Sequence, residues 1–236
     1  MITVYLDESE QSSIGKYMAV AGFFGSDQQW AALEPEWKDG LGKRKSLHMN
    51  TLRINSKPER AKQLLDRLGP LPRKHGLKPI CSTVRVADYL DLIADGGLAV
   101  KALHGYTVCF GSILEALNKI VPGHESVKVV CEIQKEHGYH AYRMFRALTM
   151  RMASPSKPYF AGIEFIPKNS LLTQPADFLA FAVTHWHEDK NSLASKVCRS
   201  ILGEDGTTYG YKLGRAFVRS VISSTKAYVK LKRAKW

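Results

Sequence analysis

Residues 1–10 read MITVYLDESE, a short apolar segment that runs directly into two acids. Ile2, Val4 and Leu6 alternate with other residues, and this period of two predicts a strand that enters a hydrophobic core. Asp7 and Glu8 then follow at the end of the predicted strand. Two interpretations are open at this point: the acids begin a polar turn, or they form the edge of a metal-binding site.

The rest of the chain predicts a mixed α/β architecture. A second strand over residues 16–24 would form a hairpin with the first, and further strands are expected at 77–86, 126–131 and 159–166. Helices are expected from Ser26–Asp27 onward, within 57–75 with a stop near Gly69–Pro70, and over 97–121, 137–152, 173–188 and 214–228. A hairpin followed by alternating helices and strands predicts a mixed sheet with helices packed on it. We expect one domain over residues 1–236, with a helical insertion at about 26–76 and a basic tail at about 226–236.

Composition favours a soluble, cytoplasmic protein without a membrane partner. The chain has 236 residues, of which 44% are hydrophobic, and no apolar run reaches the ~18 residues that a membrane span needs. Its start lacks the basic and apolar regions of a leader peptide. The four cysteines lack the paired spacing of zinc sites. Phosphate-loop and serine-hydrolase motifs are also missing from the sequence, which argues against those classes.

The charge of the chain favours a nucleic-acid partner, with an ordinary solvated surface as the alternative, and it does not distinguish DNA from RNA. The formal net charge is +12 and the pI is about 9.5, and such an excess attracts polyphosphates without specifying sequence. Arg143 and Arg146 lie three residues apart in a predicted helix, a spacing that suits backbone phosphates. Packing of their aliphatic stems is the ordinary alternative. Lys135, near Glu132, is a further candidate for contact with substrate.

Three acids stand at the ends of predicted core elements. Asp7 ends the first strand, Glu132 ends SVKVVCE, and Asp177 lies in the first turn of the helix that contains QPADFLAF. Carboxylates that converge in this way suit Mg²⁺ or Mn²⁺, and a pair of such ions supports phosphodiester cleavage. Each acid also has a structural explanation: a turn, an exposed strand end, or a favourable helix dipole.

Several segments together resemble a known family. They are YLDESE, YMAVAGFF, the helix with Trp30 and Trp37–Lys38, SLHMNTLR with His48, and QPADFLAF. Over about residues 2–186 the chain resembles the bacterial domain of unknown function numbered 3800, which is grouped with ribonuclease-H-like proteins.

The resemblance implies a ribonuclease-H-like fold and a metal-dependent nuclease centre. Asp7 and Asp177 match family positions, and Glu132 falls where a strand-end carboxylate is expected. Two departures are visible: Glu10 replaces the usual glycine, and the acid expected early in the first long helix is missing. His104 occupies that turn, and Glu115 lies farther along the helix.

These observations lead to the expectation of a metal-dependent phosphodiesterase that acts on nucleic acid. Asp7, Glu132 and Asp177 would hold Mg²⁺ or Mn²⁺, while Glu8 and His48 would orient water or substrate. A structural role for His48 remains an alternative. Two other functions stay open: a nucleic-acid-binding module without catalysis, and a component of a bacterial defence or mobile-element system that depends on a protein partner.

Overall fold

The computed structural model describes residues 1–10, 17–49, 52, 58–87, 90, 105–132, 138–167, 170–186 and 209–213. The expected helix at 214–228 and the basic tail lie outside these residues. In the described part, no helix is both long and apolar enough to cross a membrane.

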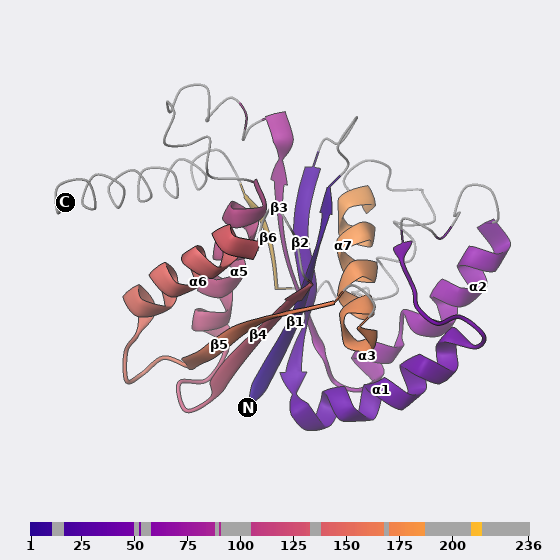
Figure 1. The fold of residues 1–236 in the computed structure, drawn as a ribbon, viewed down its shortest axis with the longest axis horizontal. Helices are drawn as coiled ribbons and strands as arrows, with labels where there is room; N and C mark the ends of the chain where they lie inside the picture. The colour runs from indigo at the N-terminus through magenta and orange to yellow at the C-terminus, as the bar shows by residue number, and fades with distance from the viewer. Residues whose placement is uncertain are drawn as a thin grey trace.

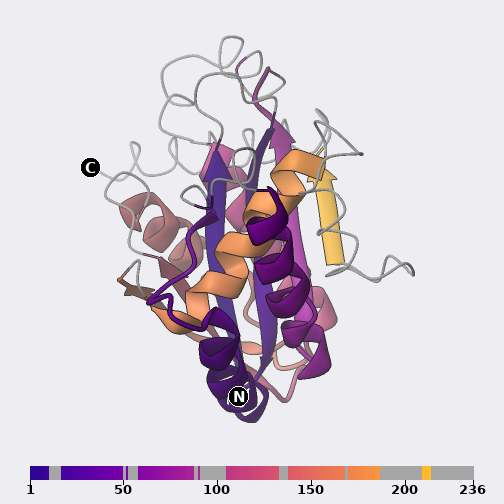
Figure 2. The same ribbon diagram turned by 90° about the vertical axis from the view of Figure 1, so that its right-hand side faces the viewer.

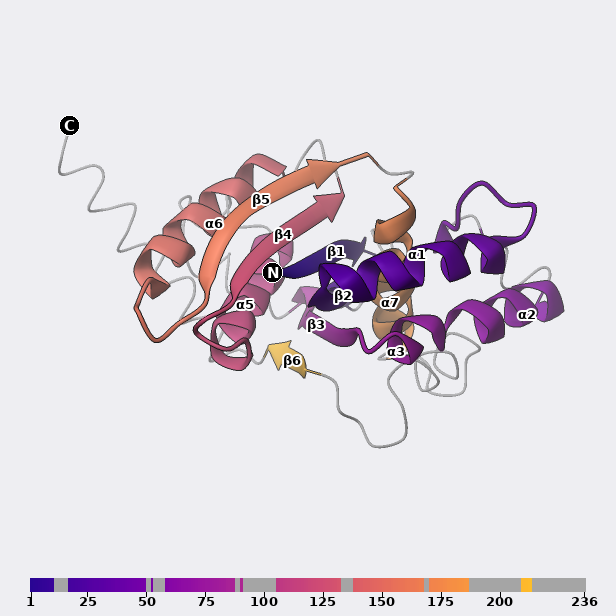
Figure 3. The same ribbon diagram turned by 90° about the horizontal axis from the view of Figure 1, so that it is seen from below.

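The strands form one mixed sheet with the order β5-β4-β1-β2-β3-β6. β1, β2 and β3 run antiparallel in succession, β4 and β5 continue the sheet parallel to β1, and β6 pairs parallel with β3. Figure 3 shows β4 and β5 beyond β1, and β6 at the opposite edge. The strands are β1 Ile2–Glu10, β2 Tyr17–Ser26, β3 Lys78–Arg85, β4 Ser126–Glu132, β5 Tyr159–Ile166 and β6 Tyr209–Leu213.

The helices between β2 and β3 form the insertion that the sequence predicts. They are α1 Asp27–Leu41, α2 Pro58–Leu68 and α3 Leu71–Lys74. α2 ends at Leu68, close to the expected stop near Gly69–Pro70, because Pro70 disfavours helical geometry at the residue before it. α1 begins at a capping box: the Gln29 N–H donates to Ser26 Oγ at 3.3 Å, and the Ser26 N–H donates to Gln29 Oε1 at 2.8 Å.

The remaining helices follow β3. They are α5 Gly105–Ile120, α6 Gly138–Met152, the short 3₁₀ turn η3 Leu171–Thr173 and α7 Gln174–Trp186. α6 and α7 closely match the expected ranges. α5 corresponds to the second part of the helix expected over 97–121, whose first residues lie outside the described chain.

Helices cover both faces of the sheet, and strand alternation divides the core accordingly. Val4 and Leu6 are buried in one cluster with Ile113 of α5, whereas Phe23 belongs to a second cluster with Phe178 of α7. In Figure 1, α5 and α6 lie on one side of the sheet, and α7 with the insertion helices lies on the other. Figure 2 shows α7 and the insertion helices in front of the strands.

The topology confirms the expected fold class. The sheet opens with the β1–β2 hairpin, continues to β3 after a helical insertion, and is extended by β4 and β5 parallel to the first strand. This arrangement is a ribonuclease-H-like mixed sheet with helices packed on it. It places the ends of β1 and β4 side by side.

Candidate metal centre

Asp7 and Glu132 lie next to each other on adjacent strands. The parallel register of β1 and β4 pairs Leu6 with Cys131, so the two acids are the next residues on their strands. Neighbouring strands lie about 4.8 Å apart. Because successive side chains alternate, both acids point away from the α5 side and toward α7. Only 6% of Asp7 and 4% of Glu132 are exposed to solvent.

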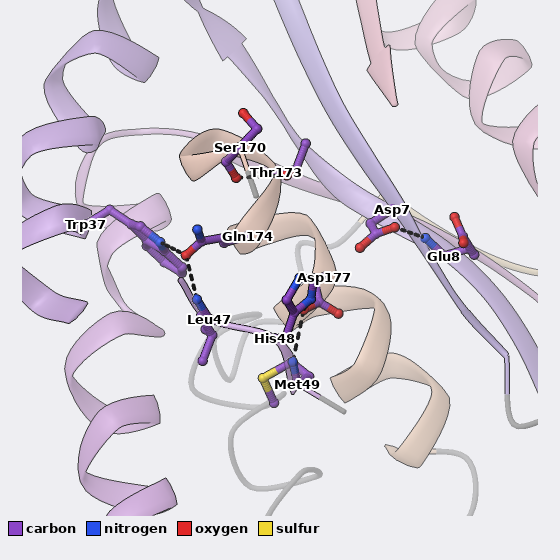
Figure 4. A network of polar contacts seen from close by, with 10 residues as sticks. All are labelled: Asp7, Glu8, Trp37, Leu47, His48, Met49, Ser170, Thr173, Gln174 and Asp177. Carbon is purple, nitrogen blue, oxygen red and sulfur yellow. Dashed lines mark hydrogen bonds and ion pairs between the residues drawn. The ribbon is translucent and has the colours of Figure 1, made fainter. Parts of the chain in front are cut away.

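α7 brings Asp177 to the same place. The helix packs against β1 and β2, and Asp177 lies in its first turn, where Pro175 is tolerated because the missing N–H has no helical partner. Figure 4 shows Asp177 on α7 facing the strand that carries Asp7. The negative charge of Asp177 contributes to the pKa shift of Asp7. The acids of β1, β4 and α7 thus share one rim of the sheet.

The environment of Asp7 disfavours its charged form. Burial raises the pKa of Asp7 well above its usual value, and the charges of Glu8, Glu132 and Asp177 raise it further. A hydrogen bond from the Glu8 N–H to Asp7 Oδ1, 2.9 Å long, acts in the opposite direction. A bound cation would offset the repulsion among these buried carboxylates.

The donor atoms fit a hard divalent cation by type. Mg²⁺ and Mn²⁺ prefer carboxylate oxygens, and Asp7, Glu132 and Asp177 offer such oxygens from three separate elements. Among the described residues, however, no group of three or more His, Cys, Asp or Glu side chains is arranged so that it could hold a metal ion. The rim therefore offers oxygen donors of the type that these metals prefer, but its side chains are not arranged to bind an ion together.

His48 reaches the rim because its segment is fastened to α7. The Leu47 N–H donates to Gln174 Oε1 at 3.0 Å, and the Met49 N–H donates to Asp177 Oδ2 at 3.0 Å. Between them, His48 Nδ1 lies 3.5 Å from Asp177 Oδ2. Figure 4 shows these contacts together. The structure therefore brings His48 beside Asp177.

Gln174 is a residue whose importance sequence reasoning missed. Its Oε1 accepts from Leu47 and also from Trp37 Nε1 at 3.2 Å, so it joins α1, the segment after α1 and α7. Only 2% of Gln174 is exposed. A signal was present in the sequence: Gln174 and Asp177 are three residues apart, a spacing that places both on one helical face.

Glu8 lies on the other face of β1 and does not join the carboxylates on the α7 side. By alternation it shares the side of Leu6. The pKa of Tyr106 is raised there, first by burial, then by the charge of Cys131, and then by the charge of Glu8. Tyr106, in the first turn of α5, was also missed. It is 2% exposed and lies near the place where the resemblance implies a helix acid.

Glu115 does not supply that acid. It follows Gly105, the first residue of α5, by ten positions, and at 1.5 Å per residue this places it about 15 Å along the helix. His104, the other residue considered for this turn, lies outside the described chain.

Two of the three basic candidates for substrate contact lie within the described residues. Arg143 and Arg146 are exposed on α6, the helix that follows β4 and its terminal acid. The Arg143 guanidinium lies 5.6 Å from the centre of the Tyr139 ring, a distance typical of cation–π contacts. Lys135 lies outside the described residues.

Comparisons with known proteins give limited similarity. No family model and no curated protein matches the chain. Two solved structures of Bst-RNase HIII are similar at 11% identity: a point mutant, with a TM-score of 0.42 over 96% of this chain and 69% of that chain, and a complex with Mn²⁺, with a TM-score of 0.41 over 96% and 70%. The order and orientation of the strands define the fold class.

Proposed function

We propose that this protein is a metal-dependent phosphodiesterase that cleaves nucleic acid. The observation that carries the proposal is the convergence of Asp7, Glu132 and Asp177, from β1, β4 and α7, at one rim of the sheet. The net charge of +12 supports a polyanionic substrate. We assign Mg²⁺ or Mn²⁺ as the cofactor because the donors are carboxylate oxygens.

Each residue would have a distinct part in the reaction. A divalent ion supplies an activated water and stabilises the leaving oxygen of a phosphodiester. Asp7 and Glu132 would bind that ion from rigid, paired strands, and Asp177 would complete the set while Met49 fixes its Oδ2. His48, with 31% of its side chain exposed, would orient or exchange a proton with water or substrate.

The remaining candidates would act on either side of this centre. Glu8, on the opposite face of β1, would influence the centre through its charge, which contributes to the raised pKa of Asp7. Arg143 and Arg146, exposed on α6, would contact backbone phosphates. Lys135 would contribute a further positive charge near the substrate.

A second function deserves the same test. Tyr106 lies in the first turn of α5, near the place where the resemblance implies a helix acid, and this departure favours a nucleic-acid-binding module without turnover. Such a module would also suit a partner-dependent component of a bacterial defence or mobile-element system.

The decisive experiment is cleavage of labelled DNA and RNA with added Mn²⁺. Wild type is expected to cut, and Asp7→Ala should lower the rate at least about 100-fold, equivalent to about 2.7 kcal/mol of transition-state stabilisation. Asp66→Ala is the control, because this acid is exposed on α2 and should leave cleavage unchanged. Equal cutting by Asp7→Ala and wild type would contradict the assignment. Tight binding without turnover would support the binding module.

A further inference from the structure

A basic pocket lies in the helical insertion, between α2 and the chain that leaves α1. At the end of α1 the chain turns at Gly42, which has a φ of 61° and whose N–H bonds to the Asp39 carbonyl oxygen at 2.9 Å. The pocket has a volume of about 410 Å³ and is lined by Lys43, Arg44, Arg60, Gln63, Leu64 and Arg67.

The α2 side of the pocket is one continuous helical face. Arg60, Gln63, Leu64 and Arg67 are spaced by three, one and three residues, which aligns them along two turns of helix. Arg60 and Arg67 are exposed, whereas Leu64 is buried and anchors the face in the core. Two guanidinium groups therefore border the hollow on a rigid element.

The lining selects for anions. Four of its six residues are cationic, and none of these described lining residues is acidic. Like charges gathered around one hollow repel each other, and a bound anion offsets that repulsion. Guanidinium groups match the geometry of phosphate oxygens, and Gln63 adds an amide donor. Leu64 is the one apolar residue among these described lining residues.

The chain connects this pocket to the acidic rim within a few residues. Arg44 lines the pocket and His48 lies against Asp177, with four residue steps between them. An extended chain spans at most about 3.6 Å per residue, so the two backbone positions lie within about 15 Å. A helical nucleic-acid strand advances about 3.4 Å per nucleotide, so the two positions lie no more than about four nucleotides apart.

We propose that the pocket binds backbone phosphates of a nucleic-acid strand within about four nucleotides of the acidic rim. This proposal rests on the proposed function, because the strand is the one whose phosphodiester would lie at Asp7, Glu132 and Asp177. The pocket would hold the strand in register, since the segment that leaves it is fastened to α7 through Leu47 and Met49.

The test compares two double variants with the same loss of charge. Arg60→Gln with Arg67→Gln removes two pocket cations. Lys38→Gln with Lys62→Gln removes two exposed cations from α1 and α2 that do not line the pocket. Binding of a fluorescent 20-nucleotide strand is followed by anisotropy in EDTA, at a series of salt concentrations.

The pocket variant is expected to bind about tenfold more weakly at low salt. Loss of two phosphate contacts should also reduce the slope of log K against log salt by about 1.5. The control variant should bind within about twofold of wild type with an unchanged slope. Equal weakening of both variants, or no change in the pocket variant, would overturn the proposal.

Two further arms identify the ligand chemistry. A dinucleotide offers the pocket a single phosphate, so its weak binding should still fall in the pocket variant and stay unchanged in the control variant. Polyglutamate should not depend on Arg60 and Arg67 for binding; if it does to the same degree as the oligonucleotide, the pocket recognises carboxylates and the proposal fails. Arg60→Lys with Arg67→Lys keeps both charges and should restore most of the affinity, whereas a misfolded double variant would show an altered thermal transition.

The result is separable from the nuclease assay because binding is measured without metal. If wild type cuts nucleic acid and the pocket variant binds like the control, only the pocket proposal falls. If wild type never cuts but the salt slope changes as expected, the pocket proposal stands and the nuclease proposal falls.

Discussion

The Asp7 carboxylate has little contact with solvent and lies among other acids, so its charge opposes folding when no cation is present. Asp7→Asn removes that charge, while the amide oxygen can still accept from the Glu8 N–H. In metal-free buffer at pH 7 we expect the free energy of unfolding to rise by about 1 kcal/mol, with the Tm higher by about 2–4 °C. Thermal unfolding followed by circular dichroism measures this change.

The pH dependence of that gain has a definite sign. The pKa of Asp7 is raised in the folded protein, so the folded state binds the proton more tightly and loses stability as the pH rises through the raised pKa. The advantage of Asp7→Asn should therefore vanish near the ordinary aspartate pKa of about 3.9. Asp66→Asn, at an exposed position, should change the Tm little at any pH. A stability loss in Asp7→Asn at pH 7 would contradict this account.

Gly22 permits the close approach of β1 and β2 beside the acidic rim. It pairs with Leu6, and a Cβ at Gly22 would lie 1.8 Å from the Tyr5 carbonyl oxygen. Because that atom belongs to a central strand, it cannot move aside easily. We expect Gly22→Ala to cost more than about 3 kcal/mol, at the upper end of overpacking effects, as measured by urea unfolding.

Gly162 offers the matched control for this substitution. It lies in β5 at the edge of the sheet, and a Cβ there would meet no atom within 4 Å. Gly162→Ala should stay within about 0.5 kcal/mol of wild type. Similar destabilisation by both substitutions would mean that strand glycines matter for backbone freedom and not for the contact with Tyr5.

At the scale of elements, α7 forms hydrogen bonds to segments that are distant in the sequence. Gln174 accepts from Trp37 Nε1 and from the Leu47 N–H, so Gln174→Met leaves two buried donors without this partner. Each such group costs about 1–3 kcal/mol, and we expect a total of about 2–4 kcal/mol in urea unfolding.

Thr184 provides a comparison on the same helix. Its Oγ1 is buried and donates to the Ala180 carbonyl at 2.8 Å, a local bond whose loss leaves no distant segment detached. Thr184→Val should cost less than about 1 kcal/mol, near the average value of one hydrogen bond. If Thr184→Val destabilises the protein as much as Gln174→Met, the gathering role of Gln174 is wrong.

Local patterns were sufficient to predict most elements. Alternation located β1, β2, β4 and β5, and the cap at Ser26 located the start of α1. β6 was missed because five residues at the edge of a sheet carry little periodic signal. The partners of Gln174 were not readable either, because Leu47 and Trp37 are 127 and 137 residues away along the chain.

The candidate site was predictable in part for the same reason. Asp7, Glu132 and Asp177 stand at element ends, and topology rules bring such ends together. The side-chain directions were not predictable: Glu8 faces α5, and Tyr106 occupies the start of that helix. These outcomes depend on strand register and helix rotation, which a single sequence does not fix.

For the molecule as a whole, the reactivity of two buried thiols measures whether each of the two core layers is closed to solvent. Cys109 belongs to the cluster under α5 and Cys81 to the cluster under α7. Burial raises the pKa of each thiol to about 12. At pH 8 both should react with iodoacetamide at least about 100-fold more slowly than in urea, because the thiolate is the reactive form. Peptide mass spectrometry gives the rate at each position, and fast labelling at one position would show that its layer is open.

The pairing of β1 has a further consequence for motion. The ladder with β4 runs from Ile2 to Leu6, whereas the ladder with β2 continues to Glu10. Amide deuterium uptake should therefore divide the strand, with Val4–Leu6 exchanging only on global unfolding and Glu8–Glu10 exchanging through smaller openings. The end of β1 beyond Asp7 would therefore open locally while the ladder between β1 and β4 stays paired.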